Sequence, residues 1–389
     1  MRTILYIFFS LIFCLSANAN TFTEVKPIQL ADQFTINSTA LGDTRSISVS
    51  LPNGYDSGKH RYPVIYMLDG MQNIFHAAGT RDVLVRAGEI PPVIIVGIKS
   101  KNRNLDMTPS QMESNPESGD ANKLLSHIIN EVIPFVEKNY RANSFRVLTG
   151  HSLGGLFSAY TLQKEPNLFD AMIITAPAFW WNEEEVIKNA STFFANNSSL
   201  DKSLFFGIGM EDGYGMRQEL KKFIAEIEKS KNPNIRWGHR EFTDEGHMSS
   251  TELTFYFGAK FIFSDVAFPQ ALANDFTVEQ FIAHEKAIQA KYGTATRQAQ
   301  EVYVPLAFSL IDKGNFDGAI AVLKRNAQAY ADNLYPRNNA WLASAYEQGG
   351  KRHEALSEYK KAYALAVETG FHELDHYRQK ILDLGGNFN

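Results

Sequence analysis

The sequence has almost no cysteine. Its 389 residues contain a single one, Cys14, which lies in an apolar stretch at the N-terminus. If that stretch is removed, the remaining chain has no thiol, which excludes disulfides, thiolate metal sites and a cysteine nucleophile. An excess of positive charge is missing too, since the formal net charge is -5 and the pI is about 6.1. A general basic surface for nucleic acid or anionic lipid is therefore not expected.

Long apolar runs are also scarce. Residues 4–15 form an apolar run of only 12 residues, whereas a membrane-spanning helix needs about 20. Arg2 before this run and the small residues up to Ala19 after it give the layout of a secretory signal peptide. The bulky Phe13 before Cys14 argues against lipid attachment. We expect residues 1–19 to be cleaved off and the protein to act in the periplasm or the medium, without a membrane anchor.

Residues 20–268 alternate short apolar runs with longer stretches of helical periodicity. The apolar runs include YPVIYMLDG, PPVIIVGI, SFRVLTG, FDAMIIT and SLFFGIG, and helical patterns such as MRQELKKFIAEIEKS lie between most of them. Strands that are apolar almost throughout are typical of a sheet with both faces covered. The pattern predicts an α/β domain with a doubly wound, mostly parallel sheet.

Residues 276–389 carry only helical patterns and contain an internal repeat. The segments LAFSLIDKGNFDGAIAVL and LASAYEQGGKRHEALSEY match at an offset of 36 residues, which aligns Gly314 with Gly350. Because the second copy resembles a tetratricopeptide repeat, we expect a smaller all-α domain of that kind. Two repeats leave their ends uncovered. The helices are therefore expected either to pack on the α/β domain or to bind a protein partner.

The stretch FRVLTGHSLGGLFSAY passes from a strand pattern to a helical pattern at Ser152. A Gly-x-Ser-x-Gly sequence in this context is typical of a nucleophile elbow, which presents the serine hydroxyl at the carboxyl edge of a sheet. Gly150 and Gly154 would avoid side chains that collide in the turn, and Gly155 would let the helix pack closely. We predict that Ser152 is a nucleophile and that the Leu153 amide donates to the oxyanion.

A serine hydroxyl needs a base to remove its proton, and the base needs an acid to orient it. In hydrolases of this architecture the base lies in a loop after the last strand, where FTDEGHMSS supplies His247. The acid is expected after the strand SLFFGIG. Asp212 is favoured there by its spacing from Gly209, and Glu211 is the alternative. His239 falls within the strand pattern IRWGHREF and is expected to be structural.

A second oxyanion donor is expected after the strand that ends at Leu68. Gly70 would free the backbone there, so that the amide of Met71 could point toward the site. The sequence contains neither a paired-histidine helix motif nor an acidic calcium loop. We therefore expect no metal and no cofactor.

Several stretches together resemble a known family. In chain order, YPVIYMLDGMQNIF, PPVIIVGIKSKNRNLDMTPS, LTGHSLGGLFSAY, APAFWWN and EGHMSS are similar to the esterases related to esterase D and to enterochelin (siderophore) esterases, a branch of the α/β-hydrolases. The resemblance extends over residues 34–263. It implies a serine esterase with an α/β-hydrolase fold, with Ser152 as nucleophile, His247 as base and Asp212 at the acid position.

The resemblance also implies residues that contact substrate. Arg103, in an R-x-x-D-x-T stretch, becomes a candidate for polar substrate contacts, and its alternative role is an ion pair with Asp106. Trp180 and Trp181 correspond to a family aromatic near the pocket. We expect Trp181 to be the exposed wall and its neighbour to belong to the core.

The sequence thus predicts an exported serine esterase that cleaves small-molecule carboxylic esters through an acyl-enzyme, with a siderophore-type ester among the candidates. One alternative is a protein-interaction module, in which the helical repeats recruit a partner and the hydrolase domain is secondary. Another is a peptidase or acyltransferase that uses the same triad.

Overall fold

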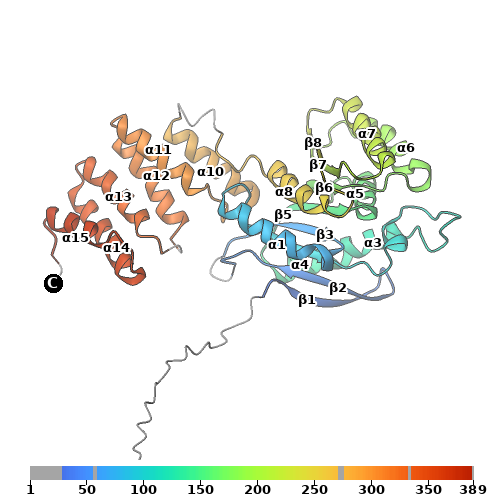
Figure 1. Ribbon diagram of the computed structural model, residues 1–389, viewed down its shortest axis with the longest axis horizontal. Coiled ribbons are helices and arrows are strands. Elements are labelled where there is room, and N and C mark those ends of the chain that lie inside the picture. Colours follow the sequence, from blue (N-terminus) through green and yellow to red (C-terminus); the bar gives the residue numbers. More distant parts are fainter. Residues whose placement is uncertain (1–28, 56–58, 270–275, 332–333, 388–389) are drawn as a thin grey trace, which may run out of the picture.

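The computed structural model describes residues 29–55, 59–269, 276–331 and 334–387, and the predicted signal peptide lies outside these ranges. It consists of an α/β part and a group of C-terminal helices beside it (Figure 1). None of the helices in the described ranges is both long and apolar enough to span a membrane.

An eight-stranded sheet forms the centre of the α/β part, in the order β1-β2-β4-β3-β5-β6-β7-β8. β2 is antiparallel to both of its neighbours, and all pairs from β4 to β8 are parallel. The predicted mostly parallel sheet is therefore confirmed. The strands are β1 (Asp32–Ser38), β2 (Asp43–Ser50), β3 (Tyr62–Leu68), β4 (Ile94–Ile98), β5 (Ala142–His151), β6 (Ala171–Thr175), β7 (Lys202–Gly209) and β8 (Ile235–Phe242).

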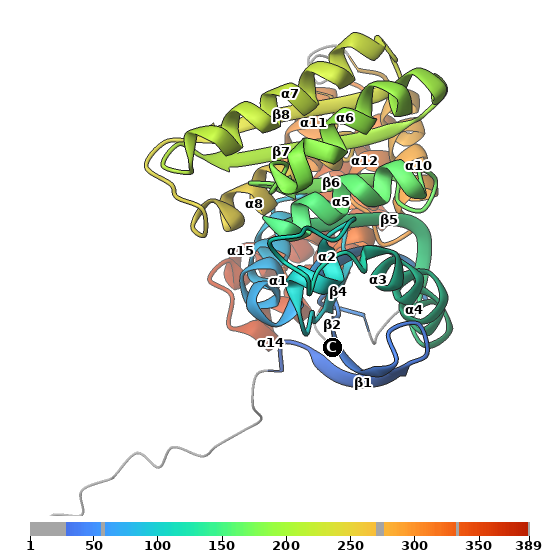
Figure 2. The same cartoon turned by 90° about the vertical axis from the view of Figure 1, so that its right-hand side faces the viewer.

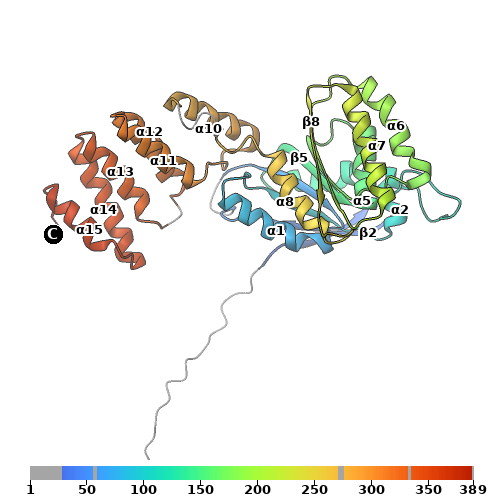
Figure 3. The same cartoon turned by 45° about the horizontal axis from the view of Figure 1, so that its top comes forward.

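Helices cover both faces of the sheet, as its nearly continuous apolar strands require. Alternate side chains of β3 divide between the two layers: Ile65 packs with α1 and α8, whereas Tyr66 packs with the helices of the other face. Figure 3 shows α1 and α8 on one side of the sheet and α6 and α7 on the other. The helices of this part are α1 (Gly70–Arg86), α2 (Arg103–Met107), α3 (Ala121–His127), the π-helix η1 (Ile128–Val132), α4 (Ile133–Asn139), α5 (Leu153–Lys164), α6 (Trp181–Asn196), α7 (Tyr214–Ser230) and α8 (Ser250–Ile262).

The repeated segments near the C-terminus fold as two helix pairs. Gly314 and Gly350 take φ values of +75° and +72° in the turns between the two helices of each pair, a conformation that glycine adopts without strain. Ala319 and Ala355 are fully buried, which lets the helices of each pair approach closely. The helices are α10 (Val278–Tyr292), α11 (Gln300–Asp312), α12 (Phe316–Ala329), α13 (Arg337–Gln348), α14 (Arg352–Thr369) and α15 (Leu374–Asp383).

The end of α10 fastens the C-terminal helices to the α/β part. Tyr292 is 1% exposed, and its ring packs edge-on against Phe145 at 5.0 Å and Phe263 at 5.1 Å between centroids. Its hydroxyl donates to Asp265 at 2.6 Å. Conversely, Phe268 packs into the core of the helices. In Figure 2 the helices lie behind the α/β part. The C-terminal helices were expected either to pack on the α/β part or to bind a protein partner, and these contacts agree with the first expectation.

We expect Tyr292→Ala to lower the free energy of unfolding by about 3–5 kcal/mol, because it removes a buried aromatic ring from the junction. Tyr292→Phe keeps the ring and loses only the hydrogen bond to Asp265, so its cost should be about 1 kcal/mol. Urea unfolding of both variants measures the difference. An equal loss in the two variants would mean that the ring does not fasten the junction.

Candidate active site

Ser152 lies in the sharp turn between β5 and α5. Its backbone has a φ of 60° and a ψ of -114°, a combination that costs a non-glycine residue about 1–3 kcal/mol. Hydrogen bonds from the neighbouring strand end hold it there: the Ser152 amide donates to the Thr175 carbonyl at 3.0 Å, and the Ser152 carbonyl accepts from the Ala178 amide at 3.0 Å. The chain therefore has the strained strand-to-helix turn that an elbow requires.

Two of the three elbow glycines are required by close contacts. A Cβ at Gly150 would lie 2.3 Å from the Gly154 carbonyl oxygen, and one at Gly155 would lie 3.0 Å from Pro177. The expectation that Gly154 also avoids a collision is wrong, because a Cβ there would meet nothing closer than Leu68 at 3.5 Å.

His247 and Asp212 form a hydrogen-bonded pair at the same edge of the sheet. His247 follows β8, Asp212 follows β7, and His247 Nδ1 lies 2.9 Å from Asp212 Oδ2. The Asp212 side chain is only 4% exposed, whereas Glu211 is exposed. Because a carboxylate can only accept, Nδ1 holds the proton and Nε2 is left with a free lone pair. The structure thus pairs the favoured acid, rather than its alternative, with the predicted base.

His151, the residue before Ser152, holds the loop of His247. Its Nε2 lies 2.7 Å from the His247 carbonyl oxygen, so this nitrogen donates, and the two rings are 4.4 Å apart between centroids. Burial, aided by the nearby His247, lowers the pKa of His151 to about 4. Within the described ranges, the Ser152 hydroxyl makes no hydrogen bond. The contact of His151 nevertheless keeps His247, the predicted base, next to the elbow. A hydrogen bond between a nucleophile and its base often tightens only when substrate is bound.

Both predicted oxyanion donors fall in the first turn of a helix. Leu153 is the first residue of α5, and Met71 is the second residue of α1. Amides in a first turn have no partner inside their own helix. The strands that precede the two helices, β5 and β3, are neighbours in the sheet. Gly70 lets α1 begin against β4, because a Cβ there would lie 2.3 Å from Gly97 Cα.

Arg103 lies at this edge but does not pair with Asp106, so that alternative is wrong. Its Nε donates to Asp69 at 2.9 Å, and a second nitrogen donates to the His151 carbonyl at 3.1 Å. Asp106 faces inward instead and binds the buried Arg45 through two nitrogens. Burial raises the pKa of Asp69 despite its guanidinium partner. Arg103 remains 37% exposed at its side chain and so can reach a substrate.

The prediction that Trp181 forms an exposed wall is wrong. Trp181 is 2% exposed, and its indole nitrogen donates to the Ser110 carbonyl at 3.1 Å, whereas Trp180 is 44% exposed. A buried tryptophan needs a partner for its N–H. The carbonyl of the segment after α2 provides one at position 181, and Trp180 is the ring left facing solvent.

Sequence reasoning assigned Trp180 to the core and missed two exposed methionines at the same edge of the sheet. We call these three side chains the apolar rim. All of them follow the carboxyl ends of parallel strands, where ligands of α/β sheets bind. Their positions after β6, β7 and β8 were the signal that could have revealed them. The rim consists of Trp180, Met210 and Met248, which are 44%, 45% and 65% exposed.

The sheet order, the elbow and the histidine loop after the last strand define the class: the fold is that of an α/β-hydrolase. Within it, residues 38–262 match the family model described as "Putative esterase", and the chain belongs to that esterase family. Ferri-bacillibactin esterase BesA of Bacillus subtilis is 29% identical over 218 residues, which cover 48% of this chain and 74% of that protein. The chain is therefore a carboxylic ester hydrolase, as its sequence predicted.

Two solved structures share the fold. An IroE-like serine hydrolase from Shewanella oneidensis has a TM-score of 0.63 at 23% identity, and the match covers 75% of this chain and 97% of that one. An uncharacterised protein from Capnocytophaga ochracea has a TM-score of 0.64 at 14% identity and matches 91% of this chain and 99% of its own. The second match reaches into the C-terminal helices.

The buried His151 gives a prediction about stability and pH. Folding lowers its pKa from 6.5 to about 4, so between these values the unfolded chain binds a proton that the folded chain does not. The contribution of neutral His151 is fully present above pH 6.5 and is lost as the pH falls toward 4, a loss of about 3 kcal/mol. The stability advantage of the unaltered protein over His151→Gln, measured by urea unfolding at pH 7, 5.5 and 4, should shrink accordingly. A constant difference would contradict a depressed pKa.

Proposed function

We propose that the protein cleaves its ester through a triad of Ser152, His247 and Asp212, and that its substrate is a siderophore-type ester. The observation that carries the triad is the 2.9 Å hydrogen bond between Asp212 and His247 at the edge where Ser152 occupies its strained turn. The proposal includes export, which rests on the signal-like composition of residues 1–19.

The proposed reaction uses the free lone pair of His247. Nε2 takes the proton of the Ser152 hydroxyl while its oxygen attacks the ester carbonyl, and the resulting imidazolium is stabilised by Asp212. The amides of Leu153 and Met71 donate to the oxyanion, each contributing about 3 kcal/mol to the transition state. His247 then passes its proton to the departing alcohol. Water, activated by the same imidazole, attacks the acyl-enzyme and releases the acid.

The apolar rim supports an ester with large apolar or aromatic groups. Trp180 offers an exposed ring face, and the exposed side chains of Met210 and Met248 can adapt to a bulky ligand. Arg103, which is paired with Asp69 but remains 37% exposed at its side chain, adds hydrogen-bond donors at the same edge, suited to an anionic or phenolic group. The relative from Bacillus subtilis is named for a siderophore ester, which agrees with this combination.

The proposed triad predicts how three variants differ in activity, and Glu211→Gln is the control among them. Ser152→Ala should abolish turnover of a short p-nitrophenyl ester, and Asp212→Asn should lower kcat by about 10⁴, because it leaves His247 in the wrong tautomer. Glu211→Gln removes the neighbouring exposed carboxylate and should stay within about twofold of the unaltered enzyme, since an exposed side chain away from the reacting atoms adds little.

Labelling with a fluorophosphonate probe, followed by peptide mapping, identifies the nucleophile directly. Labelling is expected at Ser152, and labelling at another residue would contradict the proposal. If Glu211→Gln and Asp212→Asn lowered kcat to a similar extent, the assignment of Asp212 as the triad acid would be contradicted. Product analysis with added alcohol or amine acceptors separates hydrolysis from acyl transfer.

The apolar rim makes a separate prediction about specificity. Trp180→Ala should raise KM for an ester of a bulky aromatic acid about tenfold, since one aromatic contact contributes about 1–1.5 kcal/mol. Its kcat and its KM for an acetate ester should change little. Phe308→Ala, which removes an exposed ring from α11, is the matched control. Equal KM changes for both esters would exclude a role for Trp180 in recognising the acyl group.

A further inference from the structure

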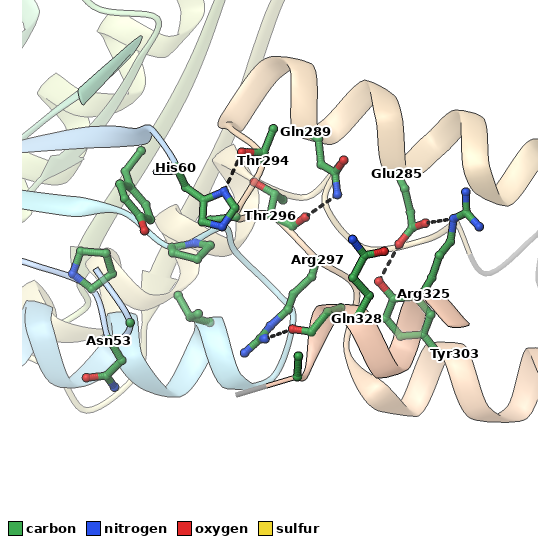
Figure 4. Close-up of a pocket in the computed structure, with 18 of the residues that line it drawn as sticks. Asn53, His60, Glu285, Gln289, Thr294, Thr296, Arg297, Tyr303, Arg325 and Gln328 are labelled. Atoms are coloured by element: carbon green, nitrogen blue, oxygen red, sulfur yellow. Dashed lines mark hydrogen bonds and ion pairs between the residues drawn. The ribbon is translucent and has the colours of Figure 1, made fainter. Parts of the chain in front are cut away.

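A large hollow lies at the junction of the two parts of the molecule, far along the sheet from the elbow. It has a volume of about 970 Å³. Its walls come from the start of β3 and the end of α1 on one side and from α10, α12 and the loop after α10 on the other (Figure 4). Ser152 follows the carboxyl end of β5, whereas this junction hollow opens at the amino ends of the strands. The two sites are therefore on opposite edges of the sheet.

Basic residues dominate the charged lining of the junction hollow. Five basic and two acidic residues line it. The acidic residues, Asp82 and Glu285, both already form ion pairs with arginines. Asp82 accepts from the buried Arg81 at 2.8 Å. Glu285 accepts from Arg325 at 3.0 Å and from Tyr303 at 2.5 Å. The basic residues are Arg86, Lys286, Arg297, Lys324 and Arg325.

Four of these cations have no carboxylate partner within 4.0 Å among the described residues. Arg297 donates to the Ala329 carbonyl and lies 4.1 Å above the Tyr330 ring. Arg86 donates to the backbone carbonyl of Asp82, one turn earlier in α1, at 3.2 Å. The ammonium group of Lys324 lies 5.6 Å from the centre of the Tyr346 ring. Lys286 is exposed beside the hollow. The protein thus gathers unneutralised positive charge here although its net charge is -5.

Like charges that converge on a recess repel one another and concentrate anions there. The volume is that of a site for a small organic molecule rather than for a single ion. Neutral hydrogen-bonding groups lie between the cations, among them Gln289 and Gln328. Because the cations come from several elements, a ligand with several separated negative groups fits them better than one with a single charge.

We propose that the junction hollow binds a small organic polyanion that carries carboxylate or phosphate groups. Arg86 belongs to the α/β part and Lys286 to the helical part, so one bound molecule contacts both. In the wall of the hollow, the α/β part and the helical part are joined by a hydrogen bond of 2.7 Å between His60 and Thr294. The ligand therefore adds ion pairs across the junction and stabilises the docked arrangement.

The experiment titrates the full chain with citrate and, separately, with tripolyphosphate by isothermal calorimetry, with sodium chloride at matched ionic strength as the blank. We expect saturable binding of at least one of the two and a higher melting temperature in its presence. The double variant Lys286→Gln/Lys324→Gln should bind at least tenfold more weakly. Hydrolysis of a p-nitrophenyl ester should be unchanged, because the catalytic edge is not touched.

The matched control is Lys313→Gln/Lys360→Gln, which removes the same charge from exposed positions of the helical part outside the hollow. It should bind like the unaltered protein. Binding of citrate alone assigns the site to carboxylates, and binding of tripolyphosphate alone assigns it to phosphates. The proposal is overturned if neither ligand binds saturably, if the hollow variant keeps full affinity, or if both double variants lose affinity equally.

Discussion

The positive φ of Ser152 is the constraint on which the rest of the catalytic edge depends. A strained residue persists only where its surroundings fix it, and here the backbone of Thr175 and Ala178 does so from the neighbouring strand end. Because β5 to β8 are parallel, their carboxyl ends meet at one edge. The loops after β7 and β8 therefore bring Asp212 and His247 to the same edge of the sheet as Ser152.

A chain of polar contacts ties this edge together across the sheet. Asp69, after β3, binds Arg103; Arg103 binds the carbonyl of His151; and His151 donates to the carbonyl of His247. The links join segments that are far apart in the sequence, so His247, the proposed base, is held from two sides, by Asp212 on its ring and by His151 on its backbone. The low pKa of His151, caused mainly by its burial, keeps this donor neutral above a pH of about 4.

Order along the chain was enough to predict that Ser152, Asp212 and His247 lie at one edge of the sheet, because parallel strands bring successive loops there. It could not predict which of two adjacent tryptophans turns inward, since that depends on a carbonyl some 70 residues away. The partner of Arg103 was missed for the same reason: Asp69 lies 34 residues earlier in the chain. Local spacing favoured Asp106, but burial gave that carboxylate to a different arginine.

The position of the C-terminal helices limits what they can do to catalysis. Tyr292 docks against Phe145 near the start of β5, and Gly293 lies against the Arg61 carbonyl just before β3. Both contacts are at the amino edge of the strands, whereas Ser152 follows the carboxyl end of β5, so these described contacts dock the helices at the edge opposite the elbow. In the proposed function, substrate shape is therefore selected by the apolar rim and not by these contacts. Any effect of the helices on turnover has to pass along the rigid strands or α1, which reaches from the junction hollow to the predicted oxyanion donor at Met71.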